Sequence, residues 1–209
     1  YSASKACAEI VTTCWRNSFF HPDDYGKSHE ILIASARAGN VIGGGDWAAD
    51  RLIPDIMRAA SKDEKVKIRN PHATRPWQHV LEPLSGYLLL GQKLLEGRRE
   101  FAEAWNFGTA EQDNLSVGEI VEHIREMWPR IDYEIHQSPS QPHEAGLLRL
   151  DCSKARIQLK WFPVWTGKET IEKTVEWYRA FYESGKVQSI YHLNCYIESA
   201  KSKNIAWAE

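Results

Sequence analysis

The chain has 209 residues, of which 43% are hydrophobic and 26% charged, ordinary values for a globular domain or a domain with part of another. It contains 26 Lys and Arg residues and 28 Asp and Glu residues, so its net charge does not favour nucleic acid or an anionic membrane as a partner. The sequence contains no apolar run long enough to span a bilayer, no signal-peptide pattern and no CxxC pair among its four cysteines. These features predict a cytoplasmic protein with reduced thiols and no membrane partner.

The first predicted element is a helix from residue 1 to about Asn17, because apolar residues recur there at three- and four-residue steps. Tyr1 and Lys5 are four residues apart and would share one face of this helix. A phenol has a pKa of about 10, and a neighbouring ammonium lowers that pKa toward the range in which the phenolate can accept a proton. The two residues are a candidate acid–base pair, or else two surface residues of an amphipathic helix. The chain opens without Met and without an N-cap residue, which predicts a fragment that begins inside a domain.

An apolar run at residues 31–35 predicts a buried parallel strand, which leads into the glycine-dense stretch GNVIGGGDW at 39–47. Such a stretch lets the backbone turn sharply or approach a ligand, or it is a simple loop. It is not a GxGxxG motif that opens a helix, so a phosphate-cradling turn is not predicted here. A helix is expected to begin at Asp50.

A basic segment follows from Arg51 to His79. It contains seven Lys and Arg residues and three acidic residues, an excess of four positive charges. Residues 65–69 alternate apolar and basic side chains, which predicts a strand with one buried face. The segment could hold a phosphate-bearing small molecule, or it could be a solvated positive face. Because no recognised nucleic-acid-binding motif is present, nucleic acid is not predicted as a partner.

Further helices and short strands are predicted along the rest of the chain. Two Ser/Thr-x-x-Glu capping boxes, at Ser116 and Thr166, predict helix starts. Other helices are expected at 80–96, where leucines share one face, and around 196–202, and strands at 105–108 and 133–135.

Several strings in the sequence, taken together, resemble one known family. They are YSASK, ARAGNVIGGGDWAADRLIPDI, IRNPHATRPWQHV, WNFG and WFPVWTGKETIEKTVEWY. In this order they resemble the extended short-chain dehydrogenase/reductase family of NAD-dependent epimerases and dehydratases, and the second and third strings are closest to its members that dehydrate CDP-glucose. The resemblance spans nearly the whole chain but matches only the C-terminal part of such an enzyme.

The resemblance implies an α/β fold with the C-terminal part of a doubly wound, Rossmann-like parallel sheet and a smaller mixed α/β substrate-binding domain. Residues 1–50, with parts of 77–110, would complete the dinucleotide-binding domain. Residues 51–185 would mainly bind the nucleotide sugar, and 186–209 would form a C-terminal tail. The glycine-rich loop and the other active-site groups would precede Tyr1, so the fragment alone is expected to be inactive.

The family resemblance also implies a mechanism with NAD as cofactor and a CDP-sugar as substrate. Hydride would pass from sugar C4 to NAD while Tyr1 removes the hydroxyl proton, and Lys5 would lower the pKa of the tyrosine and bind the nicotinamide ribose. Water would then leave across C5 and C6, and the hydride would return at C6. The full-length protein is expected to be a homo-oligomer.

Substrate-binding positions follow from the resemblance residue by residue. Asn40 and Arg75 match residues that meet the diphosphate, and Asn40 also borders the cofactor. Arg51 and Leu52 match positions that approach the nucleotide, Ile68 matches the strand that lines the base, and Asn106 matches a polar contact after the next strand.

The sequence departs from the family at Gln141, where many relatives carry Arg, and at Leu148, where they carry Tyr. His143 or Arg149 could replace the lost diphosphate contact, although an exposed loop histidine is the favoured alternative for His143. Three functions therefore stay open: a CDP-glucose 4,6-dehydratase, another sugar-nucleotide epimerase or dehydratase, and a non-catalytic relative that binds a nucleotide or assists assembly.

Overall fold

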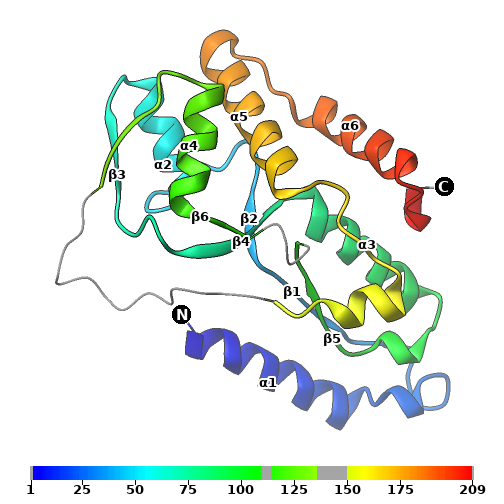
Figure 1. Ribbon diagram of the computed structural model, residues 1–209. Coiled ribbons are helices and arrows are strands. Elements are labelled where there is room, and N and C mark those ends of the chain that lie inside the picture. Colours follow the sequence, from blue (N-terminus) through cyan, green and yellow to red (C-terminus); the bar gives the residue numbers. More distant parts are fainter. Residues whose placement is uncertain (1, 110–113, 136–149, 209) are drawn as a thin grey trace.

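The computed structural model describes residues 2–109, 114–135 and 150–208 (Figure 1). Tyr1, Gln141, His143, Leu148 and Arg149 lie outside the described residues, so what was predicted for them stays a prediction.

Helices and strands alternate along the described chain. The helices are α1 (Ser2–Phe19), α2 (Leu52–Ser61), α3 (Leu81–Leu95), α4 (Val117–Met127), α5 (Gly167–Ser184) and α6 (Ser189–Ser202), with the short helices η1 (Pro22–Asp24), η2 (Arg99–Phe101), η4 (Ala155–Leu159) and η5 (Ala206–Ala208). The strands are β1 (Ser35–Ala38), β2 (Asn40–Ile42), β3 (Lys65–Ile68), β4 (Thr74–His79), β5 (Ala104–Phe107), β6 (Asn114–Ser116) and β7 (Asp132–Ile135).

Three small sheets connect these strands, and most of the pairing is parallel. β1 pairs with β5, β2 with β4, and β3 with β7, all in parallel, while β6 joins β4 antiparallel. Parallel strands need crossover connections, and α2, α3 and α4 lie in the segments that return the chain from one strand to its partner. The predicted α/β class is confirmed.

Local sequence signals placed two helix starts correctly. The Ser116 and Thr166 side chains each accept the backbone N–H of a glutamate three residues later, Glu119 and Glu169, and each glutamate accepts the N–H of its cap residue in return. These reciprocal bonds satisfy N–H groups that have no partner inside the helix. The helix α5 then ends at Gly185, which has a φ of 68°.

One strand prediction is wrong in its position. Residues 31–35 were expected to form the strand, but β1 begins only at Ser35. The partner strand β5 begins at Ala104, opposite Ser35, and within the described residues no strand pairs with residues 31–34. Between α1 and β1, Pro22–Asp24 form a turn of 3₁₀ helix, η1.

The helix α3 turns its leucine stripe outward. Leu88 and Leu95 are 76% and 90% exposed, whereas Glu82 of the same helix is fully buried. The Glu82 carboxylate accepts the N–H groups of Val164 and Trp165, at 2.9 and 2.7 Å, and the hydroxyl of Tyr196 on α6, at 2.8 Å. This network links α6 and residues 164–165 to α3, and it supplies hydrogen-bond donors to a carboxylate at a buried position.

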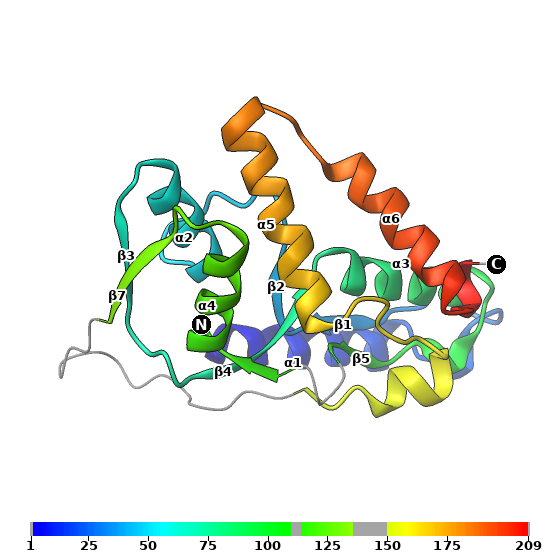
Figure 2. The same cartoon turned by 45° about the horizontal axis from the view of Figure 1, so that its top comes forward.

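The main apolar core lies between α2, α4, α5 and strands β3 and β4. Figure 1 shows these elements in the upper part of the view and α1 at the bottom, and Figure 2 shows α5 and α6 standing above the strands. Its members include Ile56, Met57, Ile120, Ile124 and Tyr178, all fully buried. By contrast, α1 has no buried residue. The buried members of this core come from described segments between Ile42 and Tyr178.

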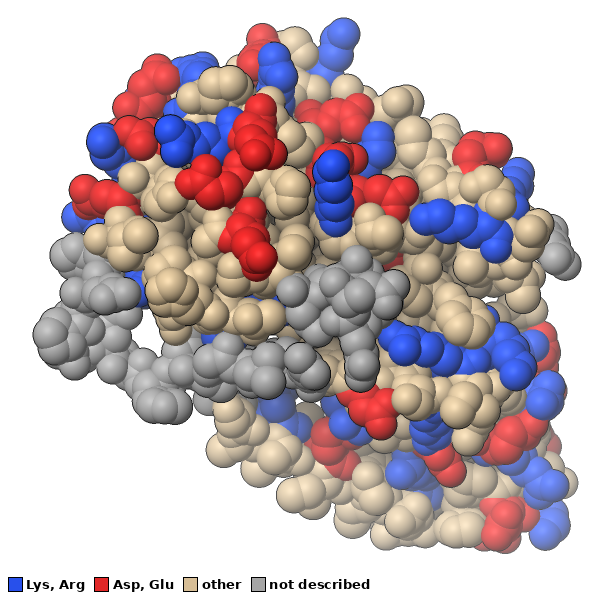
Figure 3. Space-filling view, viewed as in Figure 1, with Lys and Arg blue, Asp and Glu red and all other residues tan. Residues whose placement is uncertain are grey.

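Acidic and basic side chains are interspersed over the described part of the face in Figure 3, where no large patch of one sign forms. Within the described residues, no helix combines the length and apolar character needed to cross a bilayer.

Candidate functional site

A cavity of about 840 Å³ opens between the end of β2, the start of α2 and the strand β3. Its lining includes residues 39–43, 50–55 and 66–70, together with Arg75 and Trp77 of β4. Its volume lies within the range of small-molecule sites, about 300–1,000 Å³. It also lies beyond the carboxyl end of β1, the edge at which α/β sheets bind ligands.

The backbone conformation at Asp50 and Arg51 positions the start of α2, which lines one side of the cavity. Asp50 has a φ of 60°, a left-handed conformation that aspartate tolerates better than most residues. The chain then extends through Arg51, with φ −115° and ψ 135°, and α2 begins at Leu52. On the facing strand, β3 buries Val66 and Ile68 and exposes its two lysines, as its alternation predicted.

Three guanidinium groups line the cavity, and they differ in exposure. The Arg75 residue is 8% exposed, and its Nη1 donates to the carbonyl oxygen of Thr74 at 3.0 Å. Arg51 and Arg69 are more exposed and contact carboxylates of the loop before α2: Arg51 binds Asp46 at 3.0 Å, and Arg69 binds Asp50 at 3.3 Å. Arg75 is thus the buried cation of this cavity.

The structure brings five of the predicted substrate residues to this one cavity. They are Asn40, Arg51, Leu52, Ile68 and Arg75. Asn106 does not line it among the described residues; it lies on β5, and its amide donates to the carbonyl oxygen of Asp151 at 3.0 Å. Lys5 lies exposed on α1, away from this lining, and Tyr1 and His143 are outside the described residues.

Sequence reasoning missed the acidic side of the cavity. Asp46 and Asp50 line it and neutralise two of its arginines. The signal available for them was weak, because an aspartate after a glycine run usually marks a turn. Arg69 lies in the basic segment, but the sequence does not reveal its ion pair with Asp50, so nothing distinguished it from the neighbouring lysines.

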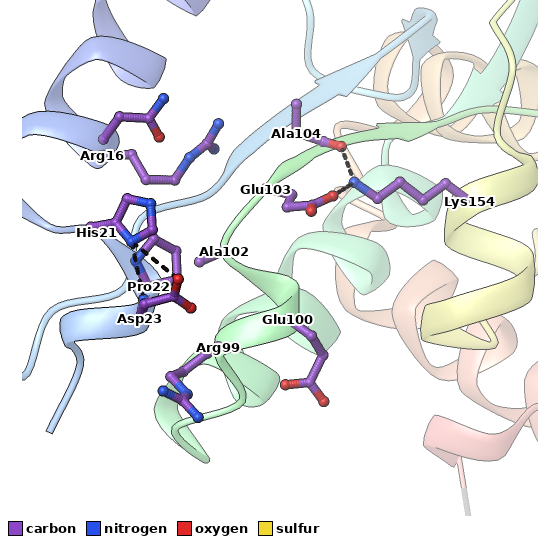
Figure 4. Close-up of a pocket in the computed structure, with 11 residues that line it drawn as sticks. Arg16, His21, Pro22, Asp23, Arg99, Glu100, Ala102, Glu103, Ala104 and Lys154 are labelled. Carbon is purple, nitrogen blue, oxygen red and sulfur yellow. Dashed lines mark hydrogen bonds and ion pairs between the residues drawn. The ribbon is translucent and has the colours of Figure 1, made fainter.

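A second cavity, of about 710 Å³, lies at the opposite edge, beside the amino ends of β1 and β5 (Figure 4). Its charged side chains contact one another: Lys154 binds Glu103 and the carbonyl oxygen of Ala104, and His21 lies 3.8 Å from Asp23. Parallel α/β sheets bind their ligands at the other edge. The first cavity is therefore the better candidate for the site.

The chemistry of that cavity is divided between an apolar part and a cationic part. Leu52, Val66 and Ile68 supply apolar surface, and Arg51 and Arg75 supply planar forks that match phosphate oxygens. The combination suits a ligand that carries phosphate at one end and a flat, weakly polar group at the other.

Comparison with known proteins shows which proteins share this sequence and fold. No protein-family model matches the chain. A CDP-glucose 4,6-dehydratase of Salmonella typhimurium is 50% identical over 181 residues, which are 87% of this chain and 50% of that protein. The chain spans about half the length of the curated relatives it matches.

Solved structures agree on the fold. An epimerase from Methanothermobacter thermautotrophicus matches with a TM-score of 0.70 and 25% identity, covering 88% of this chain and 51% of its own. A dTDP-glucose 4,6-dehydratase from Bacillus anthracis, solved with NAD, matches with a TM-score of 0.69 and 22% identity, covering 88% and 53%. The chain belongs to the extended short-chain dehydrogenase/reductase family of nucleotide-sugar epimerases and dehydratases.

Proposed function

We propose that this chain is the substrate-binding part of an NAD-dependent CDP-glucose 4,6-dehydratase, and that the first cavity holds the CDP-sugar. The observation that carries the proposal is the convergence on one cavity, with a buried arginine, of five residues that the family resemblance marked along the chain. The 50% identity to a CDP-glucose 4,6-dehydratase supports cytidine as the base. That the whole protein forms a homo-oligomer is a further expectation, which rests on the family alone.

In this proposal Arg75 binds the diphosphate, with Asn40 beside it and Arg51 at the mouth of the cavity. Leu52 on α2 and Ile68 on β3 both line the cavity, and we place the cytosine ring against these two apolar side chains. Arg75 is buried in protein of low dielectric, which strengthens its attraction to a phosphate over that of an exposed cation.

The cofactor fits this chain only in part. Lys5, exposed on α1, has donors suited to ribose hydroxyls. The pyrophosphate of a dinucleotide needs a glycine turn directly before a helix N-terminus. The glycine run at 43–45 does not provide one, because α2 begins only at Leu52. We therefore propose that the pyrophosphate binds to the half of the curated relative's length that this chain does not span, which the family resemblance places before Tyr1 and which we call the upstream segment.

When bound, NAD would supply the hydride acceptor for C4 and the hydride donor for C6 within one turnover. Tyr1 accepts the proton of the C4 hydroxyl, and the Lys5 ammonium favours the phenolate that does so. The groups that expel water from C5 and C6 are assigned to the same upstream segment.

Turnover assays test this proposal. The 209-residue chain should not convert CDP-glucose in the presence of NAD, whereas the chain joined to its upstream sequence should give the 4-keto-6-deoxy product, detected by absorbance in alkali. A 4-epimer without loss of water would show an epimerase instead. CDP binding without any turnover by the joined chain would show a non-catalytic relative.

A further inference from the structure

The loop between β2 and α2 (residues 43–51, the β2–α2 loop) is fixed from outside the cavity. The hydroxyl of Tyr178, on α5, donates to the Asp46 carbonyl oxygen at 2.6 Å and accepts the Asp46 N–H at 3.1 Å. Tyr178 is fully buried, and its burial raises the pKa of the phenol to about 12, so the hydroxyl stays protonated at neutral pH. One side chain thus satisfies both backbone groups of Asp46.

The rest of the β2–α2 loop packs against the same helix. A Cβ on Gly44 would lie 2.0 Å from the Trp177 ring, so the backbone contacts that ring directly. Trp47 packs against four rings of α5, those of Trp177, Tyr178, Phe181 and Tyr182, with centroids 5.2–6.3 Å away. Edge and tilted contacts of this kind stabilise their arrangement beyond the area they bury.

A second contact restrains the loop from α2. The Arg58 guanidinium donates to the Trp47 carbonyl oxygen at 3.0 Å and to Asp55 at 2.9 Å. Within the loop, the Asp46 carboxylate accepts the Ala48 N–H and binds Arg51, both at 3.0 Å. The atoms that face the cavity are therefore linked, through Asp46, to Tyr178.

We propose that Tyr178 is a positioning residue of the substrate site, which holds the β2–α2 loop in its binding conformation through Asp46 before substrate arrives. Without the hydroxyl, Asp46 N–H and C=O lose their partner and the loop samples other conformations. Binding would then have to order the loop that carries Asp46, Asp50 and Arg51, and this ordering weakens affinity. The inference rests on the proposed function, because it takes the cavity as the substrate site.

The test compares Tyr178→Phe with Tyr182→Phe in the 209-residue chain. The control residue lies one turn later on α5 and also packs against Trp47, but its hydroxyl makes no hydrogen bond to a described residue. By calorimetry, Tyr178→Phe should bind CDP about tenfold more weakly than wild type, the equivalent of one or two hydrogen bonds. Tyr182→Phe should bind CDP like wild type. In the joined enzyme, Tyr178→Phe should raise KM about tenfold with kcat little changed.

Hydrogen exchange separates this role from general stability and from the proposed function. Tyr178→Phe should speed amide exchange in residues 46–51 while α5 amides keep their protection. If amide exchange in the loop is the same in Tyr178→Phe as in wild type, the inference is overturned, whether or not wild type binds CDP. If wild type does not bind CDP but the exchange of the loop speeds up in the variant, only the proposed function is overturned. A lower melting temperature with unchanged CDP affinity also overturns the inference. If Tyr178→Phe does not fold, Arg58→Gln, which frees the loop from the other side, must speed the same exchange.

Discussion

Replacing Tyr1 with Phe in the enzyme that contains the upstream segment should lower turnover of CDP-glucose by about a hundredfold or more. The change removes the phenolic oxygen that would accept the C4 hydroxyl proton and leaves the ring in place. Lys5 lies in the first turn of α1, the helix that the sequence predicted.

The control for this variant is its affinity for substrate. Tyr1 is assigned no contact with the nucleotide, so CDP should bind the Phe variant as tightly as wild type. Turnover equal to wild type would remove Tyr1 from the mechanism. A loss of CDP binding that matches the loss of turnover would make Tyr1 a binding residue instead.

Replacing Arg75 with Ala should weaken CDP binding by about 2–3 kcal/mol, or roughly 30- to 150-fold, as expected for loss of a charge-assisted bond to phosphate. Arg75 is the least exposed of the cavity arginines, so water cannot easily replace it. Arg75→Lys should recover only part of the affinity, because a point charge lacks the planar fork. Calorimetry with CDP measures both.

A matched control for Arg75 is Arg125→Ala. Arg125 is exposed on α4, lies 3.7 Å from Glu122 and does not line the cavity among the described residues. Its loss should leave CDP affinity unchanged, since exposed ion pairs contribute little. Unchanged CDP affinity in Arg75→Ala, with the chain still folded, would exclude Arg75 from the diphosphate site.

The sequence predicted elements well where the signal is local. The capping boxes at Ser116 and Thr166 placed two helix starts correctly, because a cap and its partner are only three residues apart. The sequence did not predict features that depend on contacts between segments far apart in the chain. Periodicity found the helix α3 but could not show that Glu82 is buried, because its partners, Val164, Trp165 and Tyr196, lie 82 to 114 residues away.

The sequence likewise identified some residues of the candidate site and missed others. Arg75 and Ile68 were found through the strings that resemble the family, and both line the cavity. The sequence did not single out Tyr178, because its contact with Asp46 joins residues 132 positions apart. The roles of Tyr1 and His143, and the division of the chain into domains, remain predictions.

The central claim is that the cavity between α2 and β3 binds the nucleotide, and hydrogen–deuterium exchange of the 209-residue chain with and without CDP tests it most directly. Saturating CDP should slow amide exchange in residues 40–43, 50–55 and 66–70, which line that cavity. Exchange around the other cavity, in residues 16–23 and 99–104, should stay unchanged. Protection confined to 16–23 and 99–104, or no protection at saturating CDP, would contradict the account.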